Sequence, residues 1–343
     1  MKKVFAITLA LLMVAFVFVS CVANSTTETG TESQTVAKET ERDTEAATES
    51  QTTAATEAET NAVTETESYT ETQTETESET EPPILEAGVN SGIVRDGTPK
   101  KYFTLRLDDC TTQDGQIIEI LKRYNFDAVT FYMNTGLFGE NWQWVTDLNG
   151  APHIRYTKAE ALEVYAGYDV AVHTVNHLSL KNQGDRKVAY EVNTDAKVLM
   201  NMYGYTPVGM AWPGGDTEWD AHTVNVVSEK TEIKFGICTT ATNNFKLPTQ
   251  FLTWYPTCSW AQSSYLMQRF IDAELTEDML FFVWGHGYEL DSTPNGWVLF
   301  EQMIQTITAA AAENPDIVLV TNSEFYQLFK DEIPSYIPVE VEE

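Results

Sequence analysis

The distribution of hydrophobic residues divides the chain into parts of different character. An apolar run between Val4 and Val19 is followed by a long stretch, from Asn24 to about Pro83, in which large apolar side chains are nearly absent. Apolar segments then recur at short intervals from Ile84 onward. The pattern predicts four regions: 1–20, a signal segment; 21–84, a disordered tether; 85–335, one folded domain; and 336–343, an acidic tail.

Within the folded part, short apolar runs alternate with segments of helical periodicity. The runs predict strands at 101–109, 128–133, 168–173, 206–212, 233–240, 251–258, 278–286 and 316–321. Helices are predicted between them at 186–203, 221–229, 261–275 and 297–314, and Thr157 with Glu160 forms a capping-box pattern. Strands that are apolar on both faces are typical of parallel sheets covered by helices. The alternation therefore predicts an α/β fold, either a (β/α) barrel or a doubly wound sheet.

The N-terminal run has the features of a secretory signal. Lys2 and Lys3 precede it and Ser20-Cys21 follows it, so the apolar part is short for a spanning helix and ends at a small-residue cleavage site. A cysteine at this position resembles a bacterial lipoprotein signal, in which Cys21 becomes the lipidated N-terminus. The alternative is an ordinary signal with an incidental cysteine, since Phe18 stands where leucine is more usual. We expect a secreted protein, anchored through this lipid to the outer face of the bacterial cell membrane.

The charge of the chain limits its partners. There are 51 acidic and 21 basic side chains, a formal net charge of −30 at pH 7. The stretch from Asn24 to Pro83 holds 16 of these acids and 2 of these bases, and we expect it to be disordered because it buries too little apolar surface. The folded part has 35 acidic and 17 basic residues. This excess argues against nucleic acid and polyanionic substrates, whereas a neutral glycan is compatible with it.

The four cysteines are few for a disulfide scaffold of this size. With Cys21 assigned to the lipid, Cys110, Cys238 and Cys258 remain, and the sequence leaves a Cys238–Cys258 bridge open. No set of four Cys and His residues has the spacing of a structural zinc site.

Polar residues stand at the predicted carboxyl ends of several strands. In a barrel these ends form one rim, where catalytic chemistry gathers. The residues are Asp108-Asp109, His173 with His177, Pro213-Gly214-Gly215, and His286.

The histidine pair and the aspartate pair are each weak evidence alone. Two histidines at this spacing are often surface residues, although on a helical turn His173 and His177 would point the same way, and an aspartate pair often caps the next helix. Together, one carboxylate completes a three-ligand metal site with a position open for water, and the other is left as a candidate base. His286 is either a structural histidine or the acid that protonates a leaving group.

The ordered motifs are LRLDDC, VHTVNH, WPGG and WGH. They resemble the polysaccharide deacetylase family, also called the NodB-homology or carbohydrate esterase 4 (CE4) group, over roughly residues 101–329. The resemblance implies a distorted (β/α) barrel of seven to eight strands and a divalent metal, zinc first, with cobalt, nickel or manganese as alternatives. The roles that it implies are Asp108, general base; Asp109, His173 and His177, metal ligands; His286, general acid; and the main-chain N–H of Gly214, oxyanion donor.

Aromatic residues near the rim are candidates for stacking on sugar rings. Of Trp212, Trp254, Trp260 and Trp284, we expect one or two to do so and the others to belong to the core. We assign Trp212 and Trp284 to the substrate site.

The chain departs from the family pattern at three places. Ala211 stands where the R-x-P-x-G motif has arginine, so the usual orienting partner of the base is missing. Cys110 replaces the glycine after the aspartates, and its sulfur is either a bystander or within reach of the metal. The D-x-x-D-W motif has no clear counterpart, and Trp260 is the residue most similar to its tryptophan. Glu289 is either a substitute for the motif's aspartate or a loop residue in solvent.

The expected function is removal of acetyl groups from N-acetylglucosamine units of a cell-wall or extracellular glycan. An O-acetyl esterase acting on a xylan-type polymer would use the same residues, and a zinc hydrolase of small molecules is a further alternative. A non-catalytic glycan-binding lipoprotein is favoured by the departures and opposed by the five retained base, acid and ligand residues.

Overall fold

A computed structural model describes residues 92–146 and 152–338 of the protein. The predicted signal segment and tether lie outside the described residues, as do residues 339–343 of the predicted tail. The boundaries proposed for these regions therefore stay predictions.

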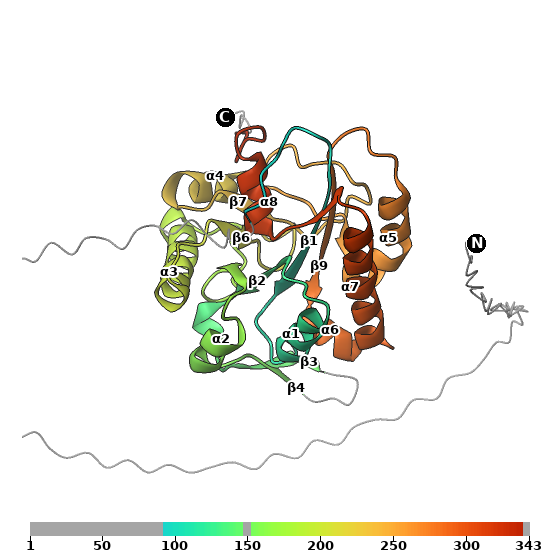
Figure 1. Ribbon diagram of the computed structural model, residues 1–343. Coiled ribbons are helices and arrows are strands. Elements are labelled where there is room, and N and C mark those ends of the chain that lie inside the picture. Colours follow the sequence, from blue (N-terminus) through green and yellow to red (C-terminus); the bar gives the residue numbers. More distant parts are fainter. Residues whose placement is uncertain (1–91, 147–151, 339–343) are drawn as a thin grey trace, which may run out of the picture. The chain divides into compact units, whose positions relative to one another are not determined.

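The described chain folds around a curled parallel sheet. Its strand order is β7-β6-β5-β2-β1-β9-β8, and β10 pairs with the first residues of β1. This is the distorted (β/α) barrel expected from the family resemblance (Figure 1). The strands are β1 (Lys101–Asp108), β2 (Val129–Met133), β5 (Asp169–Val172), β6 (Gly209–Ala211), β7 (Phe235–Ile237), β8 (Cys258–Ser259), β9 (Met279–His286) and β10 (Ile317–Leu319).

Most of the helices cover the outside of the sheet. In Figure 1, α3 and α4 lie side by side on one flank and α5 and α7 on the other. The helices are α1 (Asp114–Arg123), α2 (Lys158–Val164), α3 (Asp185–Tyr203), α4 (Ala221–Lys230), α5 (Ser263–Asp272), α6 (Gly287–Ser292), α7 (Gly296–Glu313) and α8 (Asn322–Phe329). The predicted capping box is confirmed at the start of α2, where Thr157 and Glu160 bond each other's backbone N–H.

Side chains along β1 point alternately to the two faces of the sheet and so contribute to two hydrophobic clusters, one outside and one inside the barrel. Phe103, Leu105 and Leu107 are buried in the cluster between sheet and helices, whereas Tyr102 belongs to a second cluster inside the barrel. The Tyr102 ring meets Phe325 of α8 edge-on, with 5.6 Å between ring centroids. Helix α8 therefore packs at the amino-terminal end of β1, and the site lies at the opposite, carboxyl end.

The strand predicted at 251–258 is wrong. Only Trp254 bridges Ile237 and only Cys258–Ser259 forms a short strand, because the intervening backbone contains Pro256, which has no N–H to donate. The backbone of this segment instead forms separate hydrogen bonds to two strands. The N–H of Trp254 donates to the carbonyl of Gly236 in β7, and the N–H of Thr257 donates to the carbonyl of Phe282 in β9. The sequence also gave no sign of the antiparallel pair β3 (Asn141–Thr146) and β4 (Pro152–Ile154) or of α6.

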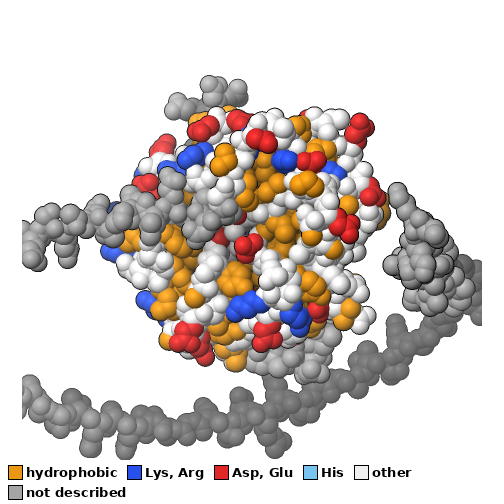
Figure 2. Space-filling view, viewed as in Figure 1, with side chains coloured by type: hydrophobic (Ala, Val, Ile, Leu, Met, Phe, Trp, Pro, Cys, Tyr) orange, Lys and Arg blue, Asp and Glu red, His pale blue; other side chains and the backbone are white. Residues whose placement is uncertain are grey.

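The three described cysteines are free and buried, so the Cys238–Cys258 bridge is not formed. None of the helices in the described ranges is both long and apolar enough to cross a membrane. On the face shown in Figure 2, the Lys and Arg side chains that the structure describes are scattered among acidic and apolar ones.

Candidate active site

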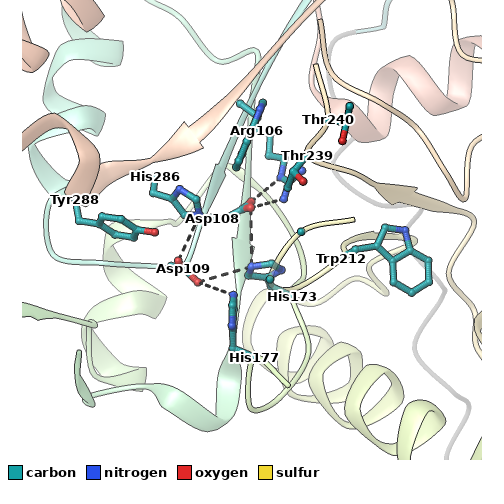
Figure 3. Close-up of a pocket in the computed structure, with 13 residues that line it drawn as sticks. Arg106, Asp108, Asp109, His173, His177, Trp212, Thr239, Thr240, His286 and Tyr288 are labelled. Atoms are coloured by element: carbon teal, nitrogen blue, oxygen red, sulfur yellow. Dashed lines mark hydrogen bonds and ion pairs between the residues drawn. The ribbon is translucent and has the colours of Figure 1, made fainter. Parts of the chain in front are cut away.

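The sequence-predicted rim residues meet in one pocket at the carboxyl ends of the strands. Asp108 ends β1, His173 follows β5, and His286 ends β9 (Figure 3). The pocket has a volume of 390 Å³. Its lining residues are Arg106, Asp108, Asp109, His173, His177, Trp212, Gly214, Gly215, Thr239, Thr240, Trp284, His286 and Tyr288.

Asp109, His173 and His177 form a set that can hold a metal ion. Oδ1 of Asp109 lies 3.7 Å from Nε2 of each histidine, and one ligand atom from each residue lies within 4.8 Å of the others. Two imidazole nitrogens and a carboxylate oxygen are a donor set typical of catalytic zinc sites, which keep a further position open. Oδ2 of Asp109 is buried without a hydrogen bond and lies 3.6 Å from Nε2 of His286, so the two carboxylate oxygens face different parts of the pocket.

The convergence of the two histidines does not come from a helical turn, as the spacing suggested. His173 and His177 lie in a loop, and Thr174 (φ 68°) and His177 (φ 50°) adopt left-handed backbone conformations. These residues fold the loop back so that the two rings lie 4.8 Å apart. Such conformations are unfavourable for most non-glycine residues and cluster at functional sites.

Hydrogen bonds fix the orientation of His173. Its Nδ1 lies 2.9 Å from the carbonyl oxygen of Ala211, which can only accept, so Nδ1 carries the proton and Nε2 presents a lone pair toward Asp109. Burial lowers the pKa of His173 to about 4, with Asp108 opposing this shift, so the ring is neutral at pH 7. A neutral imidazole is the form that binds metal.

Arg155, a buried side chain, donates two hydrogen bonds to Asp109. Its Nε donates to the Asp109 carbonyl at 2.9 Å and its Nη2 to Oδ1 at 3.3 Å. Asp109 has φ 81°, so this contact secures a strained backbone at the ligand. Arg155 was not predicted as a site residue, because it follows β4, one of two antiparallel strands that the sequence analysis did not predict.

Asp108 is held by Arg106, two residues earlier on β1. Nε of Arg106 donates to Oδ1 at 2.7 Å and Nη2 donates to Oδ2, so the pair is bidentate and buried. Burial alone would raise the pKa of Asp108, but the charge and hydrogen bonds of Arg106, together with His173 and His286, outweigh it, and the pKa falls below its ordinary value. Asp108 is therefore ionised at neutral pH, as a general base must be. Sequence reasoning missed Arg106, although a basic residue inside a buried strand is an unusual signal.

His286 has an acidic partner three residues later. Its Nδ1 lies 3.1 Å from Oε1 of Glu289, whose Oε2 accepts a 2.8 Å hydrogen bond from Trp260. Burial opposes protonation of His286, but Glu289 and Asp109 raise its pKa to about 9. His286 is therefore a charged imidazolium, with both ring nitrogens protonated, at neutral pH. Glu289 lies in α6 rather than in a loop, so of the two alternatives the structure bears out contact with His286.

The two predicted tryptophans differ in exposure. Trp212 is fully buried, donates to the Leu252 carbonyl at 3.0 Å and stacks on Trp219, so its ring shapes the pocket wall. Trp284 is partly exposed beside His286, which makes it the better placed of the two for a sugar. Trp254 belongs to the inner core cluster.

Gly214 lines the pocket with φ 74°, a conformation that favours glycine. The metal-binding set found among the described residues does not include Cys110. Burial raises the pKa of the Cys110 thiol, so it stays protonated. This is the bystander alternative for that residue.

Residues 95–233 match the family model described as polysaccharide deacetylase. The matched span contains Asp108, Asp109, His173, His177 and Gly214, whereas His286 lies beyond it. The three candidate ligands thus lie in the part of the chain that is similar to this family. Among curated proteins, none matches the sequence.

Several solved structures resemble this one at low identity. A CE4 family pseudoenzyme from Bacillus anthracis is 15% identical (TM-score 0.40; 68% of this chain, 67% of that chain). The Xyl-CE4 domain of a multidomain xylanase from the hindgut metagenome of Trinervitermes trinervoides is 16% identical (TM-score 0.40; 70% of this chain, 95% of that chain). A family 4 carbohydrate esterase from Streptomyces lividans is 14% identical (TM-score 0.38; 63% of this chain, 90% of that chain). At these values the likeness bears on neither activity nor substrate.

Proposed function

We propose that the protein is a metal-dependent carbohydrate deacetylase of the polysaccharide deacetylase family. The observation that carries this proposal is the meeting, in one pocket, of the Asp109–His173–His177 set with an ionised Asp108 and a protonated His286. The family match over residues 95–233 supports it. Asp109, His173 and His177 would hold zinc, with cobalt, nickel or manganese as alternatives.

A bound divalent ion would supply Lewis-acid chemistry, polarising the attacking water and the acetyl carbonyl. Asp108 accepts the proton of the attacking water, since it is the ionised carboxylate of the pocket. His286 donates its proton to the departing sugar nitrogen or oxygen. The main-chain N–H of Gly214 serves as a donor to the oxyanion that develops on the acetyl carbonyl.

The surroundings of Asp108 and His286 push their pKa values in opposite directions. Arg106 favours the charged carboxylate, and Glu289 favours the charged imidazole. A base and an acid are thereby both in their working forms at neutral pH. Two departures from the family pattern favoured a non-catalytic binder: the missing arginine at Ala211 and the missing D-x-x-D-W motif. In this proposal Arg106 is the partner of the base and Glu289 is the partner of the acid.

The substrate is proposed to be an N-acetylglucosamine unit of a cell-wall or extracellular glycan. A pocket of 390 Å³ is at the small end of the range for ligand sites, suited to one sugar residue. Trp284 would stack on the sugar ring. The signal segment and Cys21 support a lipid-anchored protein on the outer face of the cell membrane, where such glycans lie.

Acetate release tests the proposal. The protein would be stripped with a chelator, reloaded with zinc or cobalt, and assayed on N-acetylglucosamine oligomers and on acetylated xylan. We expect metal-restored release from the oligomers. Release from xylan alone would support the O-acetyl esterase, and release from neither, with one equivalent of metal bound, would contradict both activities.

A further inference from the structure

Arg106 is a fully buried cation inside the barrel. Burying a guanidinium is unfavourable unless each charge and donor finds a partner. Besides the two bonds to Asp108, its Nη1 donates to the carbonyl oxygen of Cys238 at 2.7 Å. The rings of Trp284 and Tyr132 lie 5.2 and 5.6 Å from its guanidinium carbon.

These contacts fix the guanidinium in three dimensions. Cys238 follows β7, whereas Arg106 and Asp108 are on β1, so the side chain spans the barrel interior from one strand to another. The aromatic contacts limit rotation of its plane. A fork held this way imposes one orientation on the Asp108 carboxylate, which a lysine with a single ammonium centre could not do.

The small residue at 211 lies in the same region. Ala211 pairs with Ile237, the residue before Cys238, and belongs to the inner cluster that contains Tyr132. Its side chain is a single methyl group, so β6 contributes no cation toward Asp108. Its carbonyl is already engaged by His173.

We propose that Arg106 is the positioning residue of the base Asp108, and that it supplies from β1 the guanidinium that β6 lacks at Ala211. The catalytic consequence rests on the proposed function. The competing account is that Arg106 only compensates a buried charge, with no effect on where the Asp108 carboxylate points.

The test compares Arg106→Lys, Arg106→Thr and the exchange variant Arg106→Thr/Ala211→Arg with the unchanged protein. The lysine variant keeps the cation and loses the fork, and the exchange variant keeps one arginine in the barrel. Metal stoichiometry, kcat and KM on N-acetylglucosamine oligomers, and crystal structures that locate the Asp108 carboxylate would be determined for each.

We expect Arg106→Lys and Arg106→Thr to lower kcat about 10- to 100-fold, with KM and bound metal little changed. The Asp108 carboxylate should be displaced in both, and the exchange variant should regain its position and part of kcat. An undisplaced Asp108 with unchanged kcat in Arg106→Lys would overturn the proposal, even if Arg106→Thr did not fold.

The crystal structures separate this inference from the proposed function. If the unchanged protein released no acetate, the deacetylase proposal would fail. A displaced Asp108 in Arg106→Lys would then still support positioning by Arg106, and an undisplaced one would refute it.

Discussion

At the scale of residues, adjacent aspartates have different neighbours. Asp108 accepts a bidentate pair of hydrogen bonds from Arg106, which occupies both of its oxygens. Asp109 accepts a side-chain hydrogen bond from Arg155 on Oδ1, the oxygen that lies 3.7 Å from both His173 and His177, and its Oδ2 lies 3.6 Å from Nε2 of His286. This difference supports the proposed roles, in which Asp109 binds the metal and Asp108 accepts a proton.

Asp108→Asn tests this assignment. An amide has no basic oxygen for the water proton, so we expect kcat for acetate release to fall by about 10²- to 10⁴-fold. Bound metal should stay at the stoichiometry of the unchanged protein, because Asp108 is not in the ligand set. Asp127→Asn, which alters an exposed aspartate, is the matched control. Full activity in Asp108→Asn would exclude Asp108 as the base.

Glu289→Gln tests the acid side of the site. The amide can still accept the Trp260 hydrogen bond but no longer stabilises a charged His286. We expect kcat to fall about 10- to 100-fold, as for partners that support a reacting group. Glu229→Gln, on an exposed position of α4, should leave kcat unchanged. Equal rates for the two variants would mean that His286 needs no carboxylate partner.

At the scale of elements, most strands were predictable because their apolar runs are buried on both faces, and most helices because their buried residues recur with helical periodicity. It failed at 251–258, where aromatic content imitates a strand but Pro256 interrupts the backbone ladder. The ligand residues were predictable because their types and order follow a family pattern. The supports Arg106, Arg155 and Glu289 were harder to find, since their contacts depend on side-chain directions that periodicity does not encode.

The loop between the two histidines is packed against Gly136, which follows β2. Gly136 N–H donates to the Val175 carbonyl at 2.9 Å, and a Cβ at Gly136 would lie 2.6 Å from that oxygen. Gly136→Ala should therefore push the loop and separate the metal ligands. We expect metal affinity to fall about tenfold or more.

Gly184→Ala is the control for this prediction. A Cβ at Gly184 meets nothing within 4 Å, and its φ of −71° is ordinary for alanine. Both variants would be titrated with zinc in competition with a chelator. Matching affinities would show that the loop yields to the added methyl group without moving its histidines.

At the scale of the complete barrel, another buried aspartate, Asp169, connects strands and a helix outside the candidate active site. Asp169 of β5 accepts hydrogen bonds from Thr130 Oγ1 of β2 at 2.7 Å and from Ser323 Oγ of α8 at 3.0 Å. It therefore links two strands to the helix that packs at the amino-terminal end of β1. Its hydrogen-bond donors are uncharged, and both burial and the neighbouring Glu324 carboxylate disfavour its ionised form.

This linkage makes stability depend on pH. Burial raises the pKa of Asp169 to about 6, and the hydroxyl hydrogen bonds only partly offset it. The folded state then holds a proton that the unfolded state has released, so the contribution is complete below about pH 4 and is lost as pH rises through 6. This rise in the pKa of Asp169 corresponds to about 2 to 3 kcal/mol of the free energy of unfolding.

Asp169→Asn removes the titration while keeping a neutral polar side chain. We expect the free energy of unfolding of the unchanged protein, minus that of the variant, to decrease between pH 4 and pH 7. Denaturant unfolding at several pH values measures this difference, in which groups that titrate alike in both proteins cancel. Asp331→Asn, at an exposed position, should give a difference that does not vary with pH. If the Asp169 difference were equally flat, the carboxylate would be ionised in the fold, and water or a cation would have to reach it between β5 and α8.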